Sequence, residues 1–354
     1  MSKLRVIALF FCLFILSSCV KEDVEDCVVE EYALLTESIV ETKEIHLAFP
    51  SIVGTPDGSK LLIAYREGHT HISFDGRIVQ KESYDQGKTW VNRKIIYESS
   101  AGNADARDPQ FLALPNGEIL CRFFVRTSEA ESTVKIIKSA DWGKTYTYIG
   151  DVPPAAKNQY TASRGNMLLV DNTIYTSIYN RWHDCWIMKS EDFGVSWDFV
   201  SWVSHSDAKL CSVNRGLNEA SLCYQDGILY AIARSGFDQP RKLTLASSKD
   251  MGETWEWGEL PVCGHSPSLT SYKDSYILTY RNINVAENEG ENVQFDCVLF
   301  RKGALASKPF TVLKSKSTDI GYGDVYVFDD FFLLCCYTGN TIRCFRVLYD
   351  IFSQ

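Results

Sequence analysis

The 354-residue sequence lacks three features that would place it in common functional classes. It has no CxxC pair and no cysteine and histidine cluster with the spacing of a zinc site, so we predict neither a metal nor a cofactor. It has no cluster of lysine and arginine and carries a net charge of −9, which argues against nucleic acid as a partner. No stretch has the apolar periodicity of a long amphipathic helix, which favours an all-β fold.

Long apolar runs are also absent, except for one near the N-terminus. Residues 6–16, VIALFFCLFIL, follow Lys3 and Arg5, and this run is too short for a membrane-spanning helix, which needs roughly 20 residues. The pattern predicts a signal peptide over residues 1–18. The segment that ends it, LSSC, resembles a bacterial lipobox, in which Cys19 is lipidated and becomes the first residue of the mature protein.

The segment after Cys19 is acidic, and Lys21, Glu22 and Asp23 resemble the tag that sends Bacteroidetes lipoproteins to the cell surface. We therefore predict a lipidated tether over residues 19–31 and an outer-membrane lipoprotein at the cell surface or in the periplasm. Residues 32–354 remain for a single domain, which we expect to be a monomer. Cys121, Cys223, Cys335 and Cys336 lie in apolar strand-like runs of this domain and are predicted to be core residues.

One eight-residue motif recurs four times. Its copies are SYDQGKTW at 83–90, SADWGKTY at 139–146, SEDFGVSW at 190–197 and SKDMGETW at 248–255. The pattern suits a hairpin turn, because Asp can hydrogen-bond nearby backbone N–H groups and Gly is free to adopt a positive φ. The copies begin 51 to 58 residues apart, which is the length of a four-stranded propeller blade.

A second repeat consists of turns with Asp or Asn between two apolar runs. Six such turns occur, at Asp57, Asn116, Asp171, Asp226, Asp274 and Asp329. Six hairpins predict a six-bladed β-propeller, in which the last two blades lack the eight-residue motif. A closed propeller hides its sheet edges, so we expect the strand-like segment 32–42 to pair with the C-terminal segment 341–351.

Residues at equal distances from the six turns are expected to occupy equivalent places around the central channel. Seven positions before the turns stand Pro50, Pro109, Arg164, Glu219, Pro267 and Tyr322. Seven to ten positions after five of the turns stand Arg66, Arg126, Arg181, Arg234 and Arg281. Any one of these arginines would equally suit a solvated rim, but a converging set predicts a ligand with an anionic group, because the guanidinium fork matches a carboxylate.

These repeats, together with the arginines, Glu219 and Tyr322, resemble the bacterial exo-sialidases with Asp-box (BNR) repeats over about residues 45–350. The segment NEASLCYQDGILYAIAR resembles the fourth blade of that family, which makes Glu219 the glutamate that assists the nucleophile and Arg234 a carboxylate-binding arginine. SPSLTSYKDSYILTYR places Arg281 in the same arginine set, and GYGDVYVFDD places Tyr322 at the nucleophile.

The resemblance implies a glycoside hydrolase that removes a terminal acidic sugar, sialic acid or a related 2-keto-3-deoxy sugar, from glycans. A neutral phenol suits this chemistry, since the substrate carboxylate repels a carboxylate nucleophile. The family takes its acid from an Asp between the first hairpin and the first Asp-box, where Asp75 is the only Asp. Glu67, His69, His71 and Asp108 are alternatives for this role.

Blade one departs from the family pattern. Where sialidases carry Arg-Ile-Pro, this chain has Ala48, Phe49 and Pro50. Arg107, Asp108 and Pro109 repeat the Arg-x-Pro spacing one blade later, and Arg66 and Arg164 are further candidates to replace the missing arginine. The departure leaves two alternatives open: a glycosidase for another sugar that uses Asp105 or Asp108, and a noncatalytic glycan-binding lipoprotein.

Overall fold

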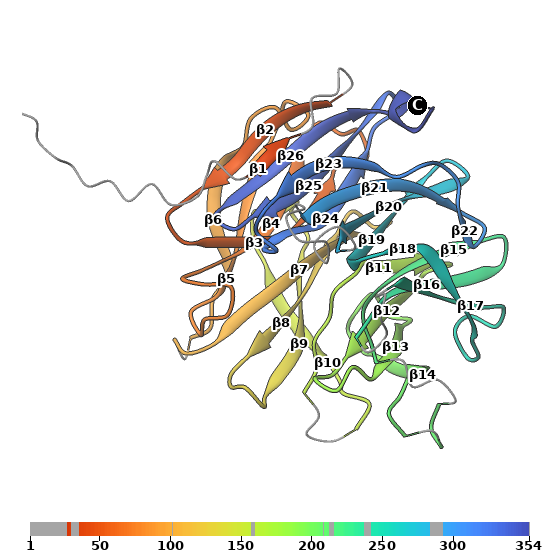
Figure 1. Ribbon diagram of the computed structural model, residues 1–354. Helices are drawn as coiled ribbons and strands as arrows, with labels where there is room; N and C mark the ends of the chain where they lie inside the picture. Colours follow the sequence, from red (N-terminus) through yellow and green to blue (C-terminus); the bar gives the residue numbers. More distant parts are fainter. Residues whose placement is uncertain are drawn as a thin grey trace, which may run out of the picture.

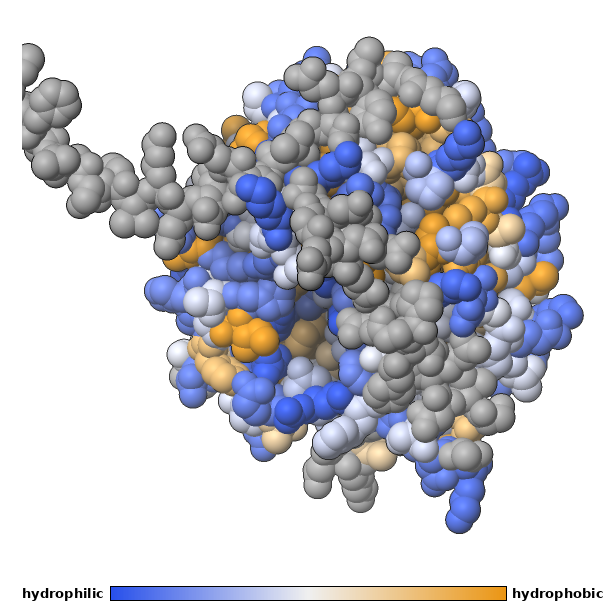
Figure 2. Space-filling model, in the orientation of Figure 1, coloured by the Kyte–Doolittle hydropathy of each residue, from blue (hydrophilic) through white to orange (hydrophobic). Residues whose placement is uncertain are grey.

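Six antiparallel β-sheets stand around a common centre in the computed structural model, which describes residues 27–29, 35–100, 102–156, 160–207, 209–211, 216–236, 242–283 and 293–353 (Figure 1). Four sheets follow the chain order outward from the channel, and the other two end in the N-terminal strands β1 and β2, so the predicted six-bladed β-propeller is confirmed. No helix among these residues has the length and apolar character needed to cross a membrane. The face seen in Figure 2 is largely hydrophilic, with separate hydrophobic patches.

The first three blades each consist of four consecutive strands. Blade one contains β3 (His46–Gly54), β4 (Leu61–Gly68), β5 (Arg77–Ser83) and β6 (Val91–Tyr97). Blade two contains β7 (Asp105–Ala113), β8 (Ile119–Arg126), β9 (Ser132–Ser139) and β10 (Thr147–Val152). Blade three contains β11 (Met167–Val170), β12 (Thr173–Tyr179), β13 (Cys185–Ser190) and β14 (Asp198–Ser204).

Blade four also consists of four consecutive strands, whereas blades five and six each include a strand from the N-terminal part of the chain. Blade four contains β15 (Leu217–Gln225), β16 (Ile228–Ser235), β17 (Lys242–Ser248) and β18 (Glu256–Cys263). Blade five contains β19 (His265–Tyr272), β20 (Ser275–Asn282), β21 (Val293–Arg301) and β23 (Phe310–Ser315), with β22 (Ala304–Leu305) beside β21 and β1 (Cys27–Val29) beside β23. Blade six contains β24 (Ile320–Val327), β25 (Phe331–Thr338), β26 (Thr341–Leu348) and β2 (Leu35–Thr42), and the 3₁₀ helix Tyr349–Ser353 follows β26.

The N-terminal strand closes the ring. β2 runs antiparallel to β26, with Leu35 opposite Val347 and Thr42 opposite Thr341. This pairing confirms the predicted contact between segment 32–42 and the C-terminal segment. Three residues of the segment predicted as a tether form β1, which pairs with β23 from Cys27↔Ser315 to Val29↔Leu313. Cys19 and the predicted signal peptide lie outside the described residues.

The core lies between neighbouring blades, because the inner strands are apolar on both faces. Every residue of β4 and of β8 is buried. Between blades one and two, Leu62 and Ile78 pack in one cluster with Phe111 and Phe123. The cysteines predicted to be core residues, Cys121, Cys223, Cys335 and Cys336, are all buried.

Each copy of the eight-residue motif forms the turn between the third and fourth strands of its blade. In the first copy, Ser83 Oγ accepts a hydrogen bond from the Gly87 amide at 2.9 Å, and Asp85 accepts from the amide and the hydroxyl of Thr89 at 2.9 and 2.6 Å. The other three copies repeat these bonds. Gly87 has a φ of 81°, and a Cβ there would lie 2.6 Å from Leu333 of blade six, so the motif needs glycine.

The inner strands of five blades each contain a two-residue bulge, visible as a shift in the pairing register. The first residue of each bulge has a positive φ near 50°. These five residues occupy equivalent places around the channel and are Phe49, Asp108, Glu219, Ser266 and Tyr322. The seven-position count was therefore right for Glu219 and Tyr322 and one residue off for Pro50, Pro109 and Pro267. The reason is that the Asp or Asn used for counting takes different places in its turn: Asp226 is the first residue after its strand, Asp274 the second and Asp57 the third.

Polar side chains two residues after these positions connect neighbouring blades. Backbone amides of the next inner strand donate to them in four cases: Phe111 N to Ser51 Oγ (3.0 Å), Leu222 N to Asn166 Oδ1 (2.8 Å), Leu269 N to Ser221 Oγ (3.0 Å) and Ile52 N to Asp324 Oδ2 (3.0 Å). Asn166 lies two residues after Arg164, which places Arg164 at the corresponding position of blade three. These bonds satisfy buried amides that a bulged strand would otherwise leave unpaired.

We predict that Asp324→Ala destabilises the propeller by about 2–4 kcal/mol. The carboxylate accepts from Ser51 Oγ at 2.7 Å and from the Ile52 amide at 3.0 Å, and its removal leaves both donors buried without a partner. Denaturant unfolding monitored by tryptophan fluorescence measures the loss. Asp330→Ala, in the exposed turn of the same blade, is the matched control and should change stability by less than about 0.5 kcal/mol. Equal effects of the two substitutions would contradict the role of Asp324.

Candidate functional site

A cavity of about 200 Å³ opens where the bulged positions of blades one, two, four and six converge. Phe49, Asp108, Glu219 and Tyr322 face it, and Arg107, Arg126, His71, Phe124, Tyr160 and Tyr179 complete most of its wall. Bulges redirect side chains and are common beside active sites. The sequence prediction that Glu219 and Tyr322 meet at one mouth of the channel agrees with this geometry.

The centre of the site is the contact between Tyr322 and Glu219. The tyrosine hydroxyl donates to Glu219 Oε1 at 2.7 Å, and both side chains are buried. Glu219 Oε2 accepts from the Ser266 amide at 3.0 Å, and Arg234 Nη1 lies 3.2 Å from Oε1. The glutamate is therefore fixed by donors from blades four, five and six.

The two groups are held in opposite protonation states. Burial alone would raise the pKa of Glu219, but the Arg234 charge, His265 and the Tyr322 hydroxyl outweigh it and lower that pKa to about 2. Burial, followed by the negative charge of Glu219, raises the pKa of Tyr322 far above its usual range. The resting site thus contains an ionised glutamate and a neutral phenol, the arrangement that general-base assistance requires.

Arginines surround the tyrosine ring. The guanidinium carbons of Arg164 and Arg281 lie 5.4 and 5.3 Å from its centroid. Arg164 donates to Gly323 O at 3.2 Å and Ser266 Oγ at 3.3 Å, and its Nη1 is buried without a hydrogen-bond partner among the described residues. Arg281 Nη1 donates to Thr318 O at 2.6 Å.

The other predicted arginines divide into two groups. Arg107 and Arg126 of blade two line the cavity. Arg66 does not reach it, because this fully buried side chain donates to Asp105 Oδ1 at 2.7 Å and to Thr70 O at 2.9 Å. Arg181 is exposed and donates to the Glu129 carbonyl. The structure thus brings Arg164, Arg234 and Arg281 together at Tyr322, adds Arg107 and Arg126, and leaves Arg66 in a structural ion pair.

Asp108, and not Asp75, shares the cavity with Tyr322. Asp108 is buried, and its Oδ1 has no hydrogen-bond partner among the described residues. Burial raises its pKa to about 6, although the charges of Arg164 and Arg107 act in the opposite direction. Asp75 lies outside the cavity on the β4–β5 loop, where its carboxylate pairs with the exposed His69. The acid expected at Asp75 therefore has its geometric counterpart at Asp108.

Apolar side chains occupy the place of the missing blade-one arginine. Ala48 is buried, and the Phe49 ring faces the channel with its centroid 5.0 Å from that of Tyr322. The Arg107 guanidinium carbon lies 5.0 Å from the Phe49 centroid on the blade-two side. Blade one thus supplies an aromatic wall where the family pattern has a cation.

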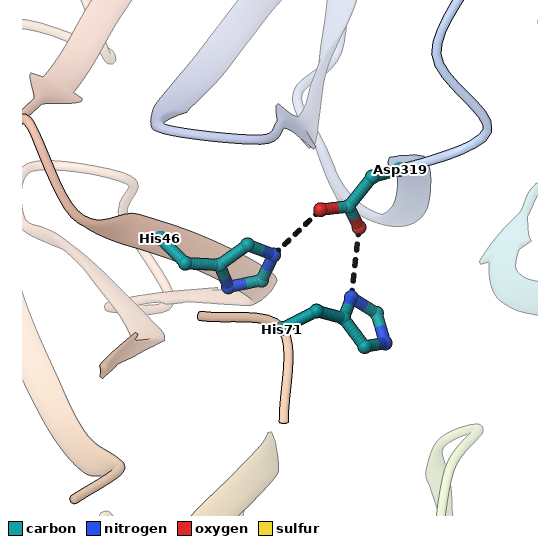
Figure 3. A group of neighbouring side chains, drawn as sticks. All are labelled: His46, His71 and Asp319. Atoms are coloured by element: carbon teal, nitrogen blue, oxygen red, sulfur yellow. Dashed lines mark hydrogen bonds and ion pairs between the residues drawn. The ribbon is translucent and has the colours of Figure 1, made fainter. Parts of the chain in front are cut away.

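Beside Phe49 lies a cluster of His46, His71 and Asp319 (Figure 3). His46 Nε2 and His71 Nδ1 each lie 2.8 Å from a different oxygen of Asp319. Among the described residues this is the one group of side chains with the geometry for a metal ion. Arg66 Nη1 approaches His46 Nδ1 at 3.2 Å and only donates, so the proton of His46 is on Nε2 and points to Asp319. In this tautomer His46 Nε2 donates to Asp319, so the contacts within the cluster form a hydrogen-bond network.

Solved structures with the same fold include one of unknown function and two sialidases. A protein from Dyadobacter fermentans, of unknown function, has a TM-score of 0.71 at 18% identity over 90% of this chain and 100% of its own. The Hadza microbial sialidase Hz136 has a TM-score of 0.68 at 13% identity over 87% of this chain and 66% of its own. The NanB sialidase from Streptococcus pneumoniae has a TM-score of 0.68 at 11% identity over 88% of this chain and 70% of its own. No protein-family model matches the chain, and no curated protein matches it in sequence.

We predict that Asp108→Asn stabilises the protein at neutral pH. In the folded state Asp108 holds its proton up to about pH 6, against 3.8 for an ordinary aspartate, so wild-type stability falls as pH rises between these values. The asparagine variant lacks this loss, so above pH 6 its free energy of unfolding should exceed that of the wild type by about 2–3 kcal/mol. Denaturant unfolding of both proteins from pH 4 to 8 measures the difference. A difference that does not change with pH would show that Asp108 titrates normally.

Proposed function

We propose that the protein is an exo-acting glycoside hydrolase that removes a terminal acidic sugar, sialic acid or a related 2-keto-3-deoxy sugar, from glycans. The observation that carries the proposal is the 2.7 Å hydrogen bond from the Tyr322 hydroxyl to an ionised Glu219 in a buried cavity. This pair is surrounded by the guanidinium groups of Arg164, Arg234 and Arg281. The two sialidases that share the fold support the same reading.

The charge balance of the site favours an anionic substrate. Five arginines lie in the cavity wall, against the tyrosine ring or beside Glu219: Arg107, Arg126, Arg164, Arg234 and Arg281. Arg107 pairs with Asp105, Arg126 with Glu129 and Arg234 with Glu219, whereas Arg164 and Arg281 have no carboxylate partner among the described residues. Asp108 is largely protonated below pH 6. A carboxylate on the sugar would compensate this excess positive charge and accept charge-assisted hydrogen bonds from the guanidinium groups.

The tyrosine and glutamate perform the first displacement. As the Tyr322 oxygen bonds to the anomeric carbon, its proton passes to Glu219 Oε1 along the existing hydrogen bond. A free phenol is a weak acid, so the transfer becomes favourable only when bond formation draws charge from the oxygen. The phenol carries no negative charge in the ground state and does not repel the substrate carboxylate.

Asp108 supplies the acid in this proposal. Its protonated carboxyl donates to the glycosidic oxygen as the bond to the leaving group breaks, and the resulting carboxylate then takes a proton from the water that hydrolyses the tyrosyl-linked sugar. Glu219 returns its proton to Tyr322 in that second step. Two displacements at one carbon retain its configuration.

The Phe49 ring favours a second candidate, a glycosidase for a different acidic sugar on the same propeller. An aromatic wall in place of a cation removes one partner of the substrate carboxylate. It provides instead an apolar surface that suits the face of a sugar ring. Attachment to the outer membrane through lipidated Cys19 belongs to the proposal in either case.

We predict that Tyr322→Phe abolishes hydrolysis, lowering the rate by at least about 10³-fold, because the nucleophilic oxygen is lost. Binding of the acidic sugar should change by less than about tenfold, since the ring and its arginines remain. Release of sugar from sialyllactose, and equilibrium binding of N-acetylneuraminic acid, measure the two effects. Tyr326→Phe is the matched control, because this tyrosine of the same strand bonds to Thr55 O away from the cavity. Intact substrate recovered from the wild-type protein would identify a binding protein.

We predict that Asp108→Asn lowers hydrolysis of natural glycosides by about 10²–10⁴-fold and affects aryl glycosides with good leaving groups much less. Wild-type turnover should fall as pH rises through about 6, because the acid loses its proton. Asp75→Asn should keep both the rate and the pH profile. If only Asp75→Asn lowered the rate of hydrolysis, Asp75 on the β4–β5 loop and not Asp108 would be the acid.

A further inference from the structure

His71 stands at the edge of the cavity beside the ring that replaces the expected arginine. Its ring centroid lies 5.6 Å from that of Phe49, and the Arg107 guanidinium carbon lies 5.0 Å from the same ring. Both His71 and Arg107 line the cavity. The two groups therefore flank Phe49 on the side of the site where blade one lacks a cation.

Asp319 fixes the orientation of His71. The carboxylate accepts from His71 Nδ1 and His46 Nε2 at 2.8 Å each and from the Tyr337 hydroxyl at 2.7 Å. Figure 3 shows His71 Nδ1 directed at Asp319, with the far nitrogen of the ring pointing away from it. His71 is thus held by one ring nitrogen, and Nε2 is the atom left for other partners.

The surroundings of Nε2 suit an anion. Arg107 Nη2 lies 3.5 Å from it, at the limit of a hydrogen bond. When His71 is protonated, two donors face each other across this distance, and they repel unless an acceptor lies between them. A carboxylate placed there accepts from both groups, so binding of the anion and protonation of His71 favour each other.

On the basis of the proposed function, we infer that His71 and Arg107 together bind the acidic group of the substrate, with uptake of a proton by His71. The charged and titratable groups that face His71 are Asp319, His46, Arg107 and Asp108, with Tyr337 behind Asp319 and Arg66 behind His46. An imidazole takes the place of a permanent cation, which makes recognition of the acid depend on pH.

Affinity for the acid then rises as pH falls, by up to about tenfold per unit while His71 is neutral in the free protein, because one proton is taken up for each ligand bound. Protonation of Asp108 also favours an anion in the same pH range. The Asp108→Asn background separates the two effects.

The test is calorimetric titration of the full-length Asp108→Asn protein with N-acetylneuraminic acid from about pH 5.5 to 8. Two buffers that differ in ionisation enthalpy give the number of protons taken up. The variant to compare is His71→Asn, whose amide keeps a donor near Asp319 but lacks a titrating Nε2. His71→Gln, whose longer amide reaches toward Arg107, is a second variant in case the first fails to fold.

We expect proton uptake in the background protein that disappears with either His71 substitution, and binding at the acidic end weakened by about tenfold or more. His69→Gln is the matched control, because this histidine of the same loop pairs with Asp75 outside the cavity and should leave both quantities unchanged. Unchanged proton uptake without His71 would overturn the inference alone. Failure of the wild-type protein to bind the acid at any pH would overturn the proposed function together with it.

Discussion

The left-handed bulge in the inner strands is the constraint on which the site depends. A regular strand alternates its side chains between the two faces of a blade, and in a propeller both faces are packed against neighbours. The bulge breaks this alternation once in each of five blades and turns Phe49, Asp108, Glu219, Ser266 and Tyr322 toward the channel. Two residues further on, Ser51, Asn166, Ser221 and Asp324 restore the amide hydrogen bonds of the neighbouring strand. The residues that face the channel and those that bond to the neighbouring blade therefore lie in the same short segments of the inner strands.

One cavity holds two carboxyl groups with very different proton affinities. Glu219 and Asp108 are both buried, so desolvation does not distinguish them. The difference comes from donors: Glu219 accepts from a backbone amide, a phenol and a guanidinium, whereas Asp108 Oδ1 has no such partner among the described residues. The Arg234 charge and these donors outweigh burial at Glu219, whereas burial prevails at Asp108, so two similar side chains are held in different protonation states.

Sequence reasoning reached the fold and the centre of the site because both are repeated features. The six turns fixed the number of blades, and equal spacing from them brought Glu219 and Tyr322 together. The spacing failed by one residue at Phe49 and Asp108, since the Asp or Asn used for counting takes different places in the turns. His46, His71 and Asp319 form no repeat, and 248 residues separate His71 from Asp319, so no pattern in the sequence joined them. Asp75 was favoured for its loop, whereas burial decides which aspartate keeps its proton.

The pairing of β2 with β26 also has a consequence for how the chain folds. Leu35 pairs with Val347, so the backbone of β2 has its partner only when the last strand of the chain is present. Blades one to four contain only strands that follow one another in the chain, and they can form while the rest is still being synthesised. Blade six joins segments about 300 residues apart, a contact whose loop-closure entropy makes it slow to form. We therefore expect ring closure to be a late step of folding, and until it occurs the unpaired edges of β2 and β26 to be exposed to aggregation.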